Sequence, residues 1–141
     1  MTLMKTIVAS IMILTAPAAL AAGSSQGYGN GGQFVRFDPV VAQYNASGEL
    51  FRIQGHCQSA CTLFLAIRNV CVERSAQLLF HAGHDRQRNI TASATQHMVS
   101  AYNGRLRQYL TAGGYMNTMA FHTLPGSALI DRFGYKECPK R

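Results

Sequence analysis

The sequence predicts an α/β fold, in which a short and mainly parallel sheet is flanked by helices. Segments with apolar residues at helical spacing alternate along the chain with short runs typical of strands. Such alternation favours parallel strands joined by right-handed helical crossovers. No internal repeat or composition change divides residues 33–141, which we therefore expect to form a single domain.

The N-terminal residues 1–21 have the pattern of a signal peptide. Lys5 supplies a positive charge, an apolar run extends over residues 7–14, and Ala19-Leu20-Ala21 matches a cleavage site. The apolar run is too short to span a bilayer and no later run is longer, so we expect no transmembrane anchor after cleavage. The predicted location is the periplasm or the extracellular medium.

A Gly/Ser-rich segment and a helix are predicted next. Residues 22–32 contain Gly and Ser at high density, which predicts a flexible lead-in that ends at Gly31-Gly32. From Gln33 to Ala46, apolar residues recur on one face of a helix. Pro39 fits the first turn of that helix, which makes Asp38 the expected cap. Ser47-Gly48 then ends the helix.

The central stretch, residues 50–81, contains a strand, a helix and two more strands. Leu50–Gly55 alternates apolar and polar residues before a glycine, and Ser59 opens a continuous apolar segment that we interpret as a buried helix. Residues 69–72 and 77–81 follow as short strands, the second ending at His81. A serine at a strand-to-helix corner, with a histidine at the end of a nearby strand, is the layout that nucleophilic catalysis needs.

Three helical segments are predicted in the C-terminal part. Residues 91–110 form the most regular amphipathic pattern of the chain, which Gly113-Gly114 ends. Residues 115–124 are interpreted as helical. Pro125 then begins a short helix that Gly134 ends.

The charge and the cysteines limit the possible partners and compartments. The net charge is +7, but the arginines are dispersed, so we expect a solvated basic surface and no nucleic-acid partner. Four cysteines in an exported chain are disulfide candidates: Cys57, Cys61, Cys71 and Cys138. Three pairings are possible and the sequence does not choose among them. A bridge to Cys138 would hold the C-terminal tail against the core.

The same stretch contains residues suited to two other chemistries, metal binding and cysteine nucleophilic catalysis. His56, His81 and His84 lie near three of the cysteines, but no second ligand pair of matching spacing follows, so we expect no metal and no cofactor. Cys57 or Cys61 could act as a nucleophile only as a thiol, and disulfide formation would prevent this.

The order of motifs resembles the Clp protease proteolytic subunit and its relatives in the Clp/crotonase superfamily. It comprises a glycine pair, a helix, the corner G-H-C-Q-S and the strand Q-L-L-F-H. The chain looks closest to the small exported Clp-like proteins of bacteria, and its final segment, residues 124–138, is similar to theirs. The resemblance extends over about residues 31–138 and is specific only over residues 31–81.

The resemblance implies a role for four residues. Ser59 would be the nucleophile and His81 the general base, and the backbone amides of Gly32 and Ala60 would form the oxyanion hole. The alternative for Gly31-Gly32 is the end of a flexible linker.

Two departures from the family pattern stand out. The family's acid should fall within residues 114–123, where the sequence has no Asp or Glu, which leaves Asn117 as a candidate orienter of His81 or a Ser-His dyad alone. The family also has a strand before the glycine pair, whereas here the preceding residues are polar and Gly-rich. The predicted sheet is therefore truncated at its N-terminal strand, with an edge that a partner or a second copy could cover.

These observations lead to two functional hypotheses. The first is an exported serine-peptidase homologue that hydrolyses peptide bonds of a peptide or protein substrate through Ser59 and His81. The second is a catalytically inactive exported module that keeps the Clp/crotonase fold and binds a partner.

Overall fold

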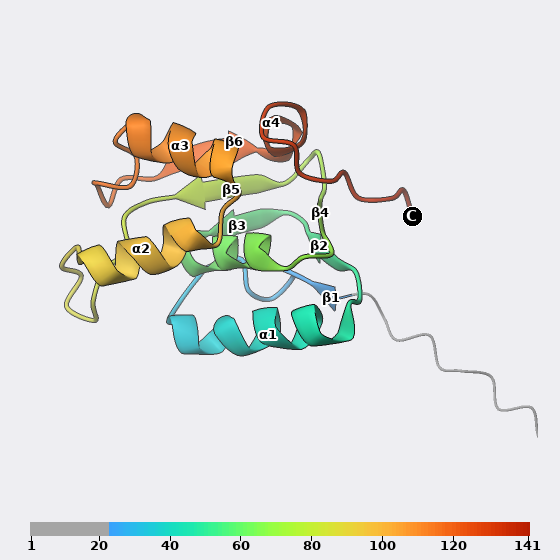
Figure 1. The fold of residues 1–141 in the computed structure, drawn as a ribbon, viewed down its shortest axis with the longest axis horizontal. Helices are drawn as coiled ribbons and strands as arrows, with labels where there is room; N and C mark the ends of the chain where they lie inside the picture. Colours follow the sequence, from blue (N-terminus) through green and yellow to red (C-terminus); the bar gives the residue numbers. More distant parts are fainter. Residues whose placement is uncertain (1–22) are drawn as a thin grey trace, which may run out of the picture.

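The structure is a computed structural model that describes residues 23–141, so the predicted signal peptide lies outside the described part. Figure 1 shows the arrangement of its elements. The elements in chain order are β1 (Gly23–Ser24), a 3-10 helix η1 (Phe34–Arg36), α1 (Asp38–Ser47), β2 (Phe51–Ile53), β3 (His56–Gln58), a second 3-10 helix η2 (Ser59–Ala66), β4 (Val70–Val72), β5 (Gln77–Phe80), α2 (Ala92–Ser100), α3 (Gly104–Ala112), β6 (His122–Pro125) and α4 (Gly126–Asp131).

The strands form two small sheets. The first has the order β1-β2-β4 and is parallel throughout. In the second, of order β3-β5-β6, β3 and β5 are parallel and β6 is antiparallel to β5. The predicted α/β class with mainly parallel strands is confirmed. The strands are, however, divided between two sheets, since β2 and β3 are separated by Gln54 and Gly55, and Gly55 has a positive φ of 63°.

Helices lie on both sides of the strands. In Figure 1, α1 lies on one side and α3 and α4 lie on the opposite side. Aromatic side chains fill the interior between them, and these rings are almost fully buried: Phe37, Phe51, Phe64, Phe80 and Tyr102. Burial of this apolar surface is the main stabilising contribution to the fold.

The Gly/Ser-rich segment is not the flexible lead-in that its composition predicts. Gly23–Ser24 form β1, which pairs with β2 in parallel, so the prediction of a sheet without an N-terminal strand is also wrong. Ser25 is 1% exposed, and its hydroxyl donates to the carbonyl of Gln54 and accepts from the Gln54 amide. These polar residues are ordered because they hydrogen-bond to the rest of the fold, which composition alone does not reveal.

The helix predicted over residues 33–46 is present in two pieces, η1 and α1. Pro39 lies in the first turn of α1 as expected, and Gly48 ends the helix in the left-handed conformation, with a φ of 72°. Asp38 is not the cap, because the cap position belongs to Phe37. The Asp38 carboxylate instead contacts the His97 Nε2, 3.0 Å away.

Residues 91–124 differ from expectation, whereas the helix that follows them is present as predicted. Residues 91–110 form two helices, α2 and α3, because Asn103 ends the run and caps α3 with its side-chain oxygen, 3.0 Å from the Leu106 amide. Residues 115–124 are turns followed by β6 and are not helical, since Leu124 and Thr123 pair with β5. The final predicted helix is present as α4, which begins at Gly126 directly after Pro125.

Two disulfides settle the pairing that the sequence leaves open. Cys57 bonds to Cys61 and Cys71 to Cys138. The second disulfide fixes the C-terminal tail to β4, where Val72 also pairs with Glu137. Within residues 23–141 no cysteine is free, which fits an exported protein in an oxidising compartment. No helix in this range is long and apolar enough to cross a membrane.

Candidate active site

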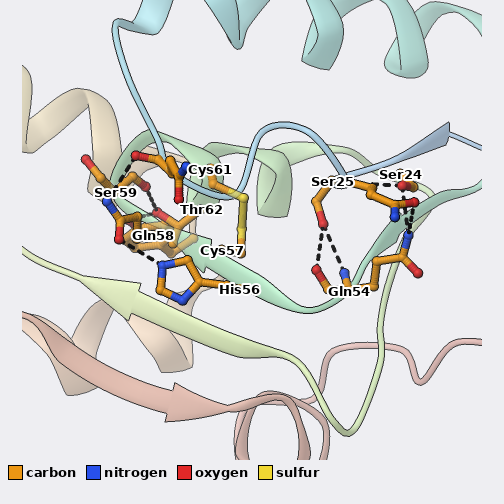
Figure 2. The surroundings of a disulfide bond; sticks show 12 residues. Ser24, Ser25, Gln54, His56, Cys57, Gln58, Ser59, Cys61 and Thr62 are labelled. Carbon is orange, nitrogen blue, oxygen red and sulfur yellow. Dashed lines mark hydrogen bonds between the residues drawn. A yellow bond between two sulfur atoms is a disulfide. The ribbon is translucent and has the colours of Figure 1, made fainter.

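Ser59 occupies a sharp corner between β3 and η2. Its φ of +55° is one of two positive values among the described non-glycine residues. A left-handed conformation costs a residue with a side chain roughly 1–2 kcal/mol, so surrounding contacts must maintain it. The Cys57–Cys61 disulfide links the residues on either side of this corner in the sequence, and Figure 2 shows Ser59 to one side of the sulfur bridge.

The buried hydroxyls of Thr62 and Tyr102 form a hydrogen-bond chain that ends at the Ser59 backbone carbonyl. The Thr62 Oγ1 donates to the Ser59 carbonyl at 2.7 Å, and it lies 2.7 Å from the Tyr102 hydroxyl. Because the Thr62 hydroxyl has a single hydrogen, Tyr102 must donate to it. Burial raises the pKa of Tyr102 well above its usual value, so the phenol keeps its proton. The Ser59 Oγ has no hydrogen-bond partner within the described residues and lies at a partly exposed position.

The glycine pair lies against this corner. A Cβ on Gly31 would be 2.9 Å from the Ser59 Cβ and 2.9 Å from the Gln58 carbonyl oxygen, too close for a side chain. Gly31 and Gly32 have positive φ values of 72° and 141°. The Gln58 amide donates to the Gly29 carbonyl at 2.9 Å, which fastens the glycine segment beside β3. The pair is therefore a packed part of the site and not the end of a linker.

The two predicted oxyanion-hole residues differ in exposure: Gly32 is exposed and lines the cavity, whereas Ala60 is fully buried and does not line it. Gly32 and Ala60 donate no backbone hydrogen bond to another residue in the part of the chain that the structure describes. Ala60 is the second residue of η2, where the first amides have no partner within the helix. An oxyanion in the cavity could accept a hydrogen bond from the Gly32 amide as the structure stands, whereas the Ala60 amide would first have to be exposed.

His81 directly follows β5 and is 3% exposed. Its Nδ1 lies 2.6 Å from the Ala82 carbonyl oxygen, which can only accept, so Nδ1 carries the proton. Nε2 therefore keeps its lone pair, as a general base requires. The His84 ring stacks on the His81 ring with 5.8 Å between centroids, and the Phe121 ring packs edge-to-face with the His81 ring with 5.2 Å between centroids.

The environment keeps the His81 imidazole neutral. Burial is the main cause of its lowered pKa, and the nearby His84 and Arg88 lower it further, against the opposing effect of the Ala82 carbonyl. Removing a cationic imidazolium from water is unfavourable, so the neutral form persists below pH 6.5, the ordinary pKa of histidine.

Ser59, His81 and Gly32 line one cavity of about 810 Å³. The predicted nucleophile, base and oxyanion-hole glycine thus lie on the same side of the fold, although they come from segments far apart in sequence. The Ser59 and His81 side chains do not hydrogen-bond to each other in this structure. Catalytic hydrogen bonds are often long without a substrate and shorten in the complex.

Asn117 does not orient His81, contrary to the prediction. The Ala82 carbonyl already accepts the Nδ1 proton, and Asn117 is exposed in the turn after Gly114. Asp85 does line the cavity, but its carboxylate accepts hydrogen bonds from the Asn89 amide and side chain. The partner of Nδ1 is thus a neighbouring backbone carbonyl and not a carboxylate, and no motif in the sequence signals this contact.

The histidines and cysteines give no metal site in the described range. No group of three or more potential ligands gathers there, and the disulfides leave no thiolate for coordination or nucleophilic attack. His56 is exposed on β3 and contacts the Gln58 side chain at 2.8 Å. His122 is half-buried, stacked on Tyr115 and hydrogen-bonded to Tyr109.

Sequence reasoning missed several residues of the cavity. His84, Arg86 and Arg88 belong to the loop after His81, and Met119 and Phe121 to the segment that was expected to be helical. The loop had a detectable signal, since the segment that follows the carboxyl end of a parallel strand commonly lines a site. The sequence contains no comparable signal for Phe121, because it precedes β6, and the antiparallel pairing of β6 with β5 depends on the tertiary structure.

No protein-family model, no curated protein and no solved structure matches the chain. The Clp/crotonase resemblance remains a prediction from the motif residues.

Proposed function

We propose that the protein is an exported serine hydrolase of the Clp/crotonase type that cleaves peptide bonds through Ser59 and His81. One observation carries the proposal: the two residues line the same cavity, with the serine on a strained corner and the histidine in the tautomer that leaves Nε2 unprotonated. Strained backbone is often retained where function requires it.

The proposed reaction is acyl transfer. The His81 Nε2 accepts the Ser59 hydroxyl proton as Oγ attacks the carbonyl carbon of a bound peptide. Amides of Gly32 and Ala60 donate to the oxyanion that forms. The resulting imidazolium protonates the leaving amine, and water then attacks the acyl-enzyme with His81 again as the base.

The Ala82 carbonyl would take the place of the acid in this mechanism. A carbonyl fixes the tautomer and the ring orientation, but it carries no full negative charge to stabilise the imidazolium. We therefore expect turnover well below that of a complete triad. The rival proposal is an inactive binding module, which the missing carboxylate and the missing Ser59–His81 hydrogen bond favour.

A fluorophosphonate probe separates the two proposals. We expect covalent labelling of the native protein at Ser59, located by mass spectrometry, and at least ~100-fold slower labelling of the Ser59→Ala and His81→Ala variants. Ser93→Ala, which changes an exposed serine of α2 outside the cavity, should label like the native protein. A correctly folded native protein that does not react at Ser59 would support the binding module.

A further inference from the structure

One side of the cavity is apolar and open to solvent. Three large hydrophobic residues are exposed in the described chain, and two of them, Val35 at 74% and Phe121 at 49%, line this cavity. Phe121 also contacts the His81 ring. Exposed apolar side chains that gather around a concave site indicate that an apolar group of a ligand covers them.

The loop after His81 carries a pair of cations. Arg86 and Arg88 line the cavity, and neither forms an ion pair with a carboxylate of residues 23–141. The acid nearest in sequence, Asp85, already accepts two hydrogen bonds from Asn89. This side of the cavity therefore has an excess of positive charge and donors that match a carboxylate.

The loop is held in a defined shape by its own hydrogen bonds. The Asp85 amide donates to the Asn89 carbonyl at 2.9 Å, the Arg88 amide donates to the Asp85 carbonyl at 3.0 Å, and His84 pairs with Ile90. Arg88 adopts a positive φ of 66° in this turn. The two arginines thus belong to an ordered turn, are exposed and line the cavity.

From these features we infer that the cavity selects peptide segments in which an acidic side chain neighbours an apolar one. The apolar side chain would pack on Val35 and Phe121, and the carboxylate would bind Arg86 and Arg88. Preferential cleavage of such segments rests on the proposed function, whereas preferential binding does not require turnover.

The chain offers a matched control for the arginines. Arg105 and Arg132 line a separate hollow beside Tyr109, with the Arg132 guanidinium 5.0 Å from that ring. Like Arg86 and Arg88 they are exposed, but they do not line the Ser59 cavity. The double variants Arg86→Gln/Arg88→Gln and Arg105→Gln/Arg132→Gln remove the same charge from the two places.

The test uses internally quenched peptides that differ only in Glu or Gln beside a single Leu. We expect native protein to cleave the Glu peptide with a kcat/KM about tenfold higher than the Gln peptide, a ratio typical of one charge-assisted contact. The ratio should fall to about 1 in Arg86→Gln/Arg88→Gln and persist in Arg105→Gln/Arg132→Gln. A native ratio near 1, or an equal loss in both variants, overturns the inference.

Binding separates this inference from the proposed function. The same two peptides, labelled with a fluorophore, are titrated against Ser59→Ala and followed by anisotropy. We expect Ser59→Ala to bind the Glu peptide more tightly than the Gln peptide, and the triple variant Ser59→Ala/Arg86→Gln/Arg88→Gln to bind both equally. This result supports the acidic preference even if the fluorophosphonate fails to label Ser59. Equal binding of both peptides overturns the preference even if labelling succeeds.

Discussion

At the scale of single residues, the site depends on how burial and one carbonyl set the state of His81. The Ala82 carbonyl fixes the proton on Nδ1, and burial lowers the pKa of the imidazole. Both effects leave Nε2 unprotonated, which is the state that the proposed general base needs. Ser59 and His81 line one cavity, and the sequence indicated the corner and the strand end that carry them because these are local features. The sequence could not identify the Ala82 carbonyl as the partner of His81, since every residue has a backbone carbonyl.

The lowered pKa of His81 predicts an acid-shifted activity profile. The neutral base is the competent form, so Ser59 labelling should persist below pH 6.5 and decline only as the pH falls through the lowered pKa. His84 and Arg88 contribute to the lowering, so Arg88→Gln should move the midpoint to higher pH. The measurement is the labelling rate from pH 4 to 8; a midpoint above 6.5 in the native protein would contradict the assignment.

The same shift has a consequence for stability with a definite sign. At a pH between the folded and unfolded pKa values of His81, the imidazole is protonated in the unfolded chain but neutral in the folded protein. The contribution of His81 to the free energy of unfolding is therefore constant above pH 6.5 and decreases as the pH falls from 6.5 through the lowered folded value. Activity and stability should thus decline over adjacent pH ranges for the same physical reason.

At the scale of elements, the glycine segment and the β3–η2 corner form one packed unit. Sequence composition suggested a flexible segment because it registers glycine and serine content but not pairing partners. The Gln58 amide and side chain both donate to this segment, at the carbonyls of Gly29 and Asn30. Hydrophobic periodicity predicted the position of α1 better than composition predicted the glycine segment. It predicted α2 and α3 as one helix, because periodicity does not detect the Asn103 cap between them.

Gly31 and Gly48 provide a matched test of that unit. Both have a φ of 72°, but a Cβ on Gly31 would collide with Ser59 whereas one on Gly48 meets nothing within 4 Å. Each alanine variant should lower the free energy of unfolding by roughly 1–2 kcal/mol from backbone strain, and Gly31→Ala by more. Only Gly31→Ala should also slow fluorophosphonate labelling, by at least ~10-fold. Equal labelling rates would show that the glycine segment does not position the nucleophile.

At the scale of the whole molecule, the two disulfides act over very different chain lengths. Cys71 and Cys138 are separated by 67 residues, and their bond ties the C-terminal tail to β4. Cys57 and Cys61 are separated by 4 residues and enclose Ser59. The even cysteine count predicted disulfides, but the Cys71–Cys138 pairing follows from the position of the C-terminal tail beside β4, which is a property of the complete fold.

This difference predicts that removing the long-range disulfide mainly lowers stability, whereas removing the short one mainly lowers Ser59 labelling. In the chain-entropy description, the long loop contributes about 4 kcal/mol to stability and the short loop about 2 kcal/mol. Cys71→Ala/Cys138→Ala should therefore produce the larger loss in the free energy of unfolding, measured by denaturation, and leave Ser59 labelling of the folded protein nearly unchanged. Cys57→Ala/Cys61→Ala should lose less stability but most of the labelling, because the positive φ of Ser59 then lacks its covalent bracket. If labelling instead follows stability in both variants, the short disulfide has no special role in holding the nucleophile.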